Sequence, residues 1–102
     1  MTNNPAKQIH TALRALLIEA RTRIRSASEK ILWYQIMMST RDAQDAARRH
    51  ADPAIAIDDL REMRQWVIAH RSTCHGVASR LAEYDTAEIM INNTIGILSQ
   101  IK

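Results

Sequence analysis

A row of mostly apolar residues recurs in steps of three and four through residues 6–38, which read AKQIHTALRALLIEARTRIRSASEKILWYQIMM. The row consists of Ala6, His10, Leu13, Leu17, Ala20, Ile24, Ala27, Ile31, Tyr34 and Met38. A second row consists of Ala56, Leu60, Met63, Val67, His70, Cys74, Val77, Leu81 and Tyr84, followed after Glu88 by Ile91, Ile95 and Leu98. Such steps keep a row on one side of a helix. The sequence therefore predicts an all-α protein with one long heptad-patterned helix in each half.

The strongest break between the two rows is the stretch His50-Ala51-Asp52-Pro53. A proline pushes the residue before it out of the helical region, while Asp52 can cap the next helix and Pro53 can begin it. We therefore expect a turn at residues 50–53 and an antiparallel hairpin of two helices. Residues 1–102 are expected to form a single helical domain.

Two weaker signals could divide each long helix. Ser39 and Asp42 have the spacing of a capping box, and Asp85-Thr86-Ala87-Glu88 forms a second such box. Both apolar rows stay in phase across these points apart from Glu88, which favours unbroken helices. The alternative is a chain that breaks near Ser39 and Asp85 and folds back as a monomeric three- to four-helix bundle.

Apolar side chains exceed what a two-helix hairpin can bury. The stretch 31–38 is apolar nearly all round the helix, and Trp66, Val67 and Ile68 form a similar cluster in the second half. A helix that is apolar on more than one side is buried on more than one side. We therefore expect two hairpins to pair as a homodimer and complete a four-helix bundle.

Composition narrows the classes of protein. Hydrophobic residues make up 46% and charged residues 25% of 102 residues, which is typical of a folded globular chain. With 2 Gly and 2 Pro, the chain has little turn chemistry for a sheet. Residues 89–98 are too short and too polar to cross a bilayer. Because Cys74 is the only cysteine and no signal peptide is evident, we expect a cytoplasmic protein, with signal-less export as the alternative.

Catalysis and metal binding have little support in the sequence. The heptad positions hold Leu, Ile, Ala, Met and Val, which cannot assemble the buried charged groups that an active site needs. His70 and Cys74 are four residues apart and could bind a metal ion, but both lie in the apolar row, where they are expected to be core residues. We therefore expect no enzyme activity, no cofactor and no metal site.

The surplus of large apolar residues indicates protein binding. Tryptophan is enriched among the residues that dominate binding energy, and methionine adapts to irregular contact surfaces. The sequence therefore predicts a protein–protein interaction module, such as an adaptor, chaperone, inhibitor or anti-regulator. Its expected partner-binding residues are Trp33, Met37, Met38, Trp66 and Met90.

Nucleic-acid binding is the alternative function. The formal net charge is +3 and the sequence pI is about 9.5. The basic residues considered for this role are Arg21, Arg25, Arg48 and Arg49. Acidic residues one helical turn away, such as Glu29 for Arg25 and Asp45 for Arg49, are expected to neutralise much of this charge. The sequence therefore favours protein binding over nucleic-acid binding.

Overall fold

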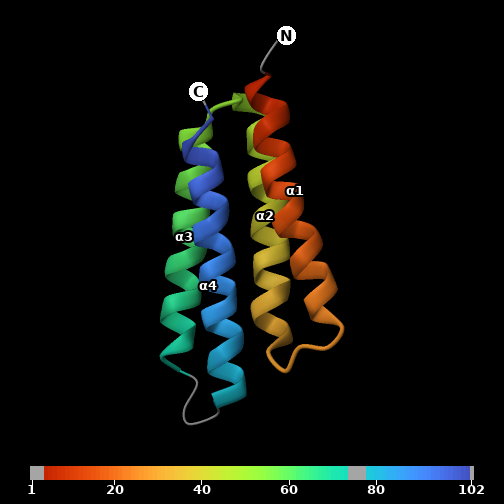
Figure 1. Cartoon of the computed structure of the whole chain (residues 1–102), viewed down its shortest axis with the longest axis vertical. Helices are drawn as coiled ribbons and strands as arrows, with labels where there is room; N and C mark the ends of the chain where they lie inside the picture. The colour runs from red at the N-terminus through yellow and green to blue at the C-terminus, as the bar shows by residue number, and fades with distance from the viewer. Residues whose placement is uncertain (1–3, 74–77, 102) are drawn as a thin grey trace.

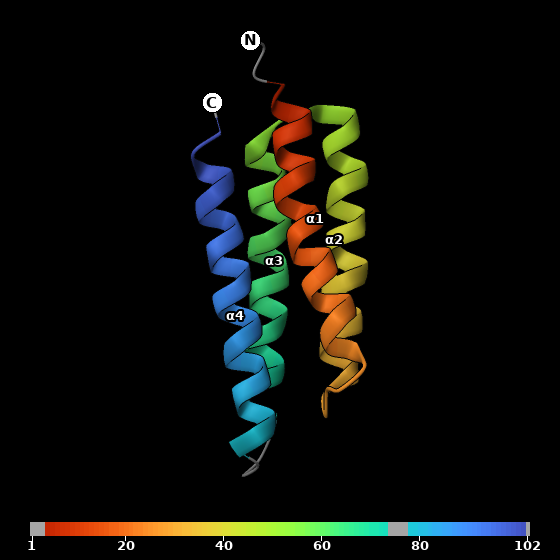
Figure 2. The ribbon, with the colours of Figure 1, turned by 45° about the vertical axis from the view of Figure 1, so that its right-hand side comes forward.

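A computed structural model describes residues 4–73 and 78–101, and these form four α-helices with no strand among them. The helices are α1 (Pro5–Ile24), α2 (Lys30–His50), α3 (Pro53–Arg71) and α4 (Ala78–Ser99). They run alternately up and down and lie side by side in a bundle whose two chain ends share one end (Figures 1 and 2). Its principal extents are 50 × 23 × 19 Å. The all-α prediction is confirmed.

Four helices stand where the sequence predicts two long ones. Residues 25–29 separate α1 from α2, and α3 ends at Arg71 whereas α4 begins at Ala78. The breaks considered at Ser39 and Asp85 are absent, because Ser39 lies within α2 and Asp85 within α4. The chain thus folds back within each half, but at different residues from those that the capping boxes indicate.

The starts of α1 and α3 follow local capping chemistry. The Oδ1 atom of Asn4 accepts a hydrogen bond from the backbone N–H of Lys7 at 3.3 Å, and Pro5 is the first helical residue. Asp52 accepts from the backbone N–H of Ala54 at 3.0 Å, and Pro53 begins α3. These side chains satisfy amide groups that have no partner within the helix. The turn between α2 and α3 lies where this chemistry predicts it.

The start of α2 is stabilised from another helix. Glu29 stands at the cap position and its side chain makes no capping hydrogen bond. Instead, the carboxylate of Glu83 in α4 accepts from the backbone N–H groups of Ser28 at 3.2 Å and Glu29 at 3.4 Å. It also accepts from the indole Nε1–H of Trp33 at 3.2 Å. Glu83 therefore caps the N-terminus of α2, although it lies more than fifty residues later in the sequence.

The first row is buried in α1 but exposed in α2, on the other side of the break at residues 25–29. In α1 the row residues Leu13, Leu17 and Ala20 are buried, as the heptad pattern predicts. In α2 the same row is exposed, and the opposite side of the helix is buried instead, with Leu32, Trp33, Ile36, Thr40, Ala43 and Ala47. Because the two helices are separated and antiparallel, each one turns its own apolar side inward, and the phase of the row does not carry across the break.

The second row follows the core more closely. Its residues Ala56, Leu60, Met63, Val67, Tyr84, Ile91 and Leu98 are buried. His70 differs from its expected core position, because it is exposed and its Nδ1–H donates to the carbonyl oxygen of Trp66 at 2.9 Å. That position near the C-terminus of α3 lets the imidazole satisfy a carbonyl of its own helix. Cys74 lies outside the described residues.

Candidate functional site

The outer side of α2 carries an uncovered row of large apolar side chains. Ile31 is 75% exposed, Tyr34 48% and Met38 60%, and their steps of three and four residues place them on one side of the helix. We call these three residues the α2 apolar face. The other side of α2 is already buried in the bundle. Apolar residues on both sides are typical of a helix that is buried on both sides.

The five predicted partner-binding residues divide between core and surface. Of these, only Met38 belongs to the α2 apolar face. Met37 and Met90 are half-buried against the core, as is Trp66. Trp33 is only 1% exposed and lies in the core, which differs from the surface position that the sequence predicts. Sequence reasoning overlooked Ile31 and Tyr34 as surface residues because the heptad row assigns them to the interior.

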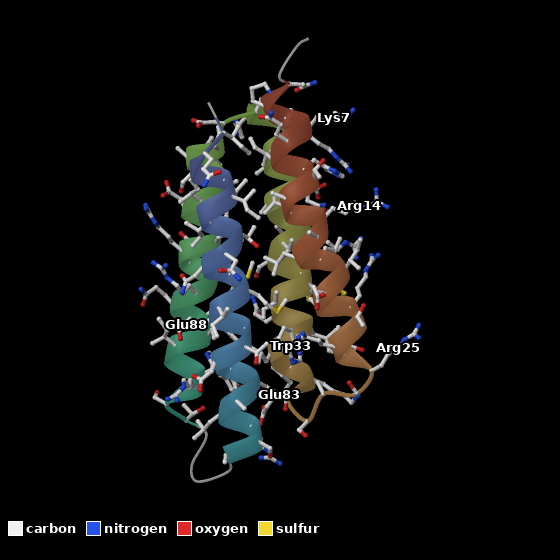
Figure 3. The ribbon with its side chains drawn as sticks, viewed as in Figure 1. Lys7, Arg14, Arg25, Trp33, Glu83 and Glu88 are labelled. Atoms are coloured by element: carbon white, nitrogen blue, oxygen red, sulfur yellow. The ribbon has the colours of Figure 1, made fainter. Side chains whose placement is uncertain are left out.

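Trp33 is held by polar contacts on two sides. Its indole N–H points toward the carboxylate of Glu83 in α4 (Figure 3). The guanidinium carbon of Arg23 lies 5.4 Å from the centroid of its ring, within the range of a cation–π interaction. Arg23 in turn pairs with Glu19 at 3.4 Å. These contacts explain how a large aromatic residue is fully buried with its one donor satisfied.

Trp66 borders an acidic groove between α2 and α3. The groove has a volume of about 460 Å³, and its lining residues are Gln35, Ser39, Asp42, Ala46, Asp59, Glu62, Met63 and Trp66. One face of Trp66 stacks on His70, with ring centroids 3.8 Å apart. Partial burial raises the pKa of Asp59, and repulsion from Glu62, Asp58 and Asp42 raises it further. The groove thus concentrates negative charge and disfavours an anionic ligand.

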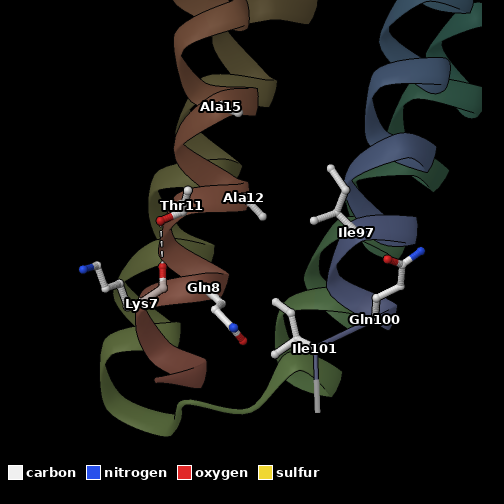
Figure 4. Close-up of a pocket in the computed structure, with 8 residues that line it drawn as sticks. All are labelled: Lys7, Gln8, Thr11, Ala12, Ala15, Ile97, Gln100 and Ile101. Carbon is white, nitrogen blue, oxygen red and sulfur yellow. Dashed lines mark hydrogen bonds between the residues drawn. The ribbon is translucent and has the colours of Figure 1, made fainter. Parts of the chain in front are cut away.

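A second groove lies between α1 and α4 near the chain ends (Figure 4). It arises because α1 packs much more closely along α2 than along α4. Its volume is about 670 Å³, and its lining residues are Lys7, Gln8, Thr11, Ala12, Ala15, Ile97, Gln100 and Ile101. Small residues on α1 face Ile97 of α4 and Ile101, which follows the end of α4, so the lining surface is mostly apolar. The groove is open and shallow enough to accept a side chain or a short segment rather than to enclose a substrate.

Four cations follow the outer side of α1. Lys7, Arg14, Arg21 and Arg25 are all exposed, and we call them the α1 basic row. Figure 3 shows its labelled members Lys7, Arg14 and Arg25 projecting from the same edge of the bundle. Within residues 4–73 and 78–101, none of the four side chains makes an ion pair or a hydrogen bond.

The ion pairs expected for Arg25 and Arg49 at helical spacing are replaced by others, whereas the pairs of Arg23 with Glu19 and of Arg61 with Asp58 do follow that spacing. Glu29, expected beside Arg25, pairs instead with Arg80 of α4 at 3.4 Å. Asp45, expected beside Arg49, pairs with Arg48 at 3.6 Å. Arg25 and Arg49 are therefore left without an acidic partner in the described part of the chain. Of the four arginines considered for nucleic acid, Arg21 and Arg25 share the α1 basic row, whereas Arg48 and Arg49 lie in the last turn of α2.

Other kinds of site find no support in the described residues. These residues contain no group of three or more His, Cys, Asp or Glu side chains placed to hold a metal ion. The helices that they form include none with the length and apolar character to cross a membrane. The pKa of Arg71 is raised first by its hydrogen bond with Asp85 and then by the charge of that carboxylate. The two side chains form an exposed pair that joins α3 to α4.

Comparisons with known proteins return no relative: no family model, curated protein or solved structure matches this chain. The class that the structure defines is therefore that of a four-helix chain with an up-down-up-down order. Function must be inferred from its surfaces.

Proposed function

We propose that this chain is a non-enzymatic protein-interaction module that forms a homodimer and binds another protein, as an adaptor, chaperone, inhibitor or anti-regulator does. The observation that supports the proposal best is the α2 apolar face, formed by Ile31, Tyr34 and Met38. The proposal places the protein in the cytoplasm, where a single cysteine needs no disulfide partner.

The α2 apolar face suits contact with another helix. Its residues follow steps of three and four, which is the spacing of the contact positions between packed helices. Contiguous apolar residues on a protein surface typically mark a contact with another molecule. The buried side of α2 already satisfies the fold through Leu32, Trp33 and Ile36, so the exposed side is available for a partner.

A second copy fits this face in an antiparallel arrangement. In a two-fold contact centred beside Tyr34, Ile31 of one protomer packs against Met38 of its partner, and the reverse contact follows by symmetry. The three side chains alone cover less than the roughly 800 Å² per protomer that a standard interface buries. The polar residues beside them on α2, Gln35, Arg41, Asp42 and Asp45, are expected to form the rim.

The α1–α4 groove is expected to receive the other protein. It shares no residue with the α2 apolar face, so a dimer leaves its lining available. Ala12 and Ala15 allow a close approach, while Ile97 and Ile101 offer apolar contact. A short apolar segment with a few polar groups for Gln8 and Gln100 matches this lining. Each protomer of the dimer would thus hold one segment of the other protein.

The change Met38→Asp is expected to convert the dimer to a monomer, because it places a charge against the partner's Ile31 at both ends of the two-fold contact. Light scattering at micromolar concentration should give twice the chain mass of 11.6 kDa for the parent protein and 11.6 kDa for the variant. Ile89→Asp is the matched control, because Ile89 is 59% exposed but lies on α4. A parent mass of 11.6 kDa, or dissociation by Ile89→Asp as well, would contradict the proposed dimer.

A further inference from the structure

The two halves of the chain differ sharply in charge. Residues 1–50, which include α1 and α2, contain nine Lys and Arg against four Asp and Glu, a net charge of +5. Residues 51–102 contain five against seven, a net charge of −2. The net charge of +3 thus hides a polarised molecule, and a surface of one sign attracts a ligand of the other.

The basic residues are most regularly spaced along α1. Lys7, Arg14 and Arg21 are spaced by seven residues, and Arg25 follows one turn later, so the row extends about 27 Å at 1.5 Å per residue. The only acidic residue of α1, Glu19, is engaged by Arg23. The four cations of the row therefore face solvent without a counter-charge from the described residues.

We propose that the α1 basic row binds the phosphate backbone of double-stranded DNA. Its length of about 27 Å spans about eight base pairs at an axial rise of 3.4 Å each, so the row can meet phosphates of both strands along one side of the duplex. Ammonium and guanidinium groups are the main partners of phosphate oxygens in protein–DNA complexes. Binding is expected to be independent of sequence, because contacts to phosphates carry no direct information about the bases.

The surroundings of the row favour a duplex over two other polyanions. Single-stranded nucleic acid is normally held by aromatic rings beside the cations, and the row contains none. A membrane-bound amphipathic helix inserts its apolar side into the bilayer. In α1 that side, with Leu13, Leu16 and Leu17, is buried in the bundle. A straight row of cations on a folded support suits the side of a stiff duplex.

The test is fluorescence anisotropy with a labelled 30-base-pair duplex of arbitrary sequence, between 50 and 200 mM NaCl. Four phosphate contacts predict that the logarithm of the association constant falls with the logarithm of salt with a slope of about −3.6. The double change Arg14→Gln/Arg21→Gln should weaken binding more than about tenfold at the lowest salt and reduce the slope by about two. Arg61→Gln/Arg64→Gln removes the same charge from α3 and should leave binding within about twofold.

Three results would overturn the inference. These are absence of binding at 50 mM NaCl, equal weakening by both double variants, and tighter binding to vesicles of anionic lipid or to single strands than to the duplex. The light-scattering mass of each variant is measured in parallel. Because the α1 basic row and the α2 apolar face share no residue, a loss of DNA binding with the dimer intact distinguishes this inference from the proposed function.

Discussion

Replacement of Ile36 by aspartate is expected to unfold the protein, whereas the same replacement at Ile31 is expected to leave it folded. Ile36 is fully buried, and a carboxylate there must lose its hydration without gaining a partner. That cost is several kcal/mol, comparable with the whole stability of a domain of this size. Ile31 is 75% exposed on the single chain, so aspartate at that position is expected to dissociate the proposed dimer and to remain in water on a folded monomer.

Thermal unfolding followed by circular dichroism measures this difference, and Val67→Asp provides a second core position. Val67 is fully buried in α3 and should behave like Ile36. If each half of the chain were one long helix, the variants would rank differently in stability. Ile31 and Val67 lie in the apolar rows and would be core residues, whereas Ile36 lies outside them. A folded Ile36→Asp protein together with an unfolded Ile31→Asp protein would show that α2 turns its other side inward.

Replacement of Glu83 by alanine is expected to cost about 3 kcal/mol of unfolding free energy. The change removes the acceptor of two backbone N–H groups at the start of α2 and of the indole N–H of Trp33. Hydrogen bonds to a charged group contribute about 1.5–3 kcal/mol, and a buried donor left without a partner adds a desolvation cost. Trp33 is almost fully buried, so its indole N–H depends on this carboxylate for a protein acceptor.

Urea denaturation measures this effect, with Glu88→Ala as the control. Glu88 lies on the same helix and is likewise half-buried, and it makes no hydrogen bond or ion pair among the described residues. Glu83→Gln keeps one acceptor oxygen and should fall between the parent protein and Glu83→Ala. Equal stabilities for Glu83→Ala and Glu88→Ala would contradict the role of Glu83 as a remote N-cap.

Local signals in the sequence predict the helical class and two of the helix starts well. Asn4-Pro5 and Asp52-Pro53 each combine a capping side chain with a proline, and both act through atoms close in the sequence. Heptad spacing likewise identifies most of the core of α1, α3 and α4. These features depend on periods and short-range chemistry, which a sequence displays directly.

The break at residues 25–29 could not be predicted because its cause is not local. Arg25-Ser26-Ala27-Ser28-Glu29 contains neither glycine nor proline, and Arg25 keeps helical dihedral angles. The Nζ group of Lys30 donates to the carbonyl oxygen of Ile24 at 2.8 Å across the turn, and Glu83 and Arg80 of α4 contact the turn from a distant part of the sequence. Helical spacing alone favours a pair between Arg80 and Glu83 themselves. Placement of the α2 apolar face on the surface, and of Trp33 in the core, depends on these contacts from α4.

The distance between two spin labels tests most directly whether the chain folds back at residues 25–29. Labels on cysteines introduced at Lys7 and Arg48, with Cys74 replaced by serine and labelled chains diluted into unlabelled ones, report the intrachain distance alone. The four-helix chain places the start of α1 and the end of α2 at one end of the bundle (Figure 1), so we expect a distance of no more than about its width of 23 Å. A continuous helix from Pro5 to His50 would separate them by about 60 Å, and a distance of that size would contradict the account.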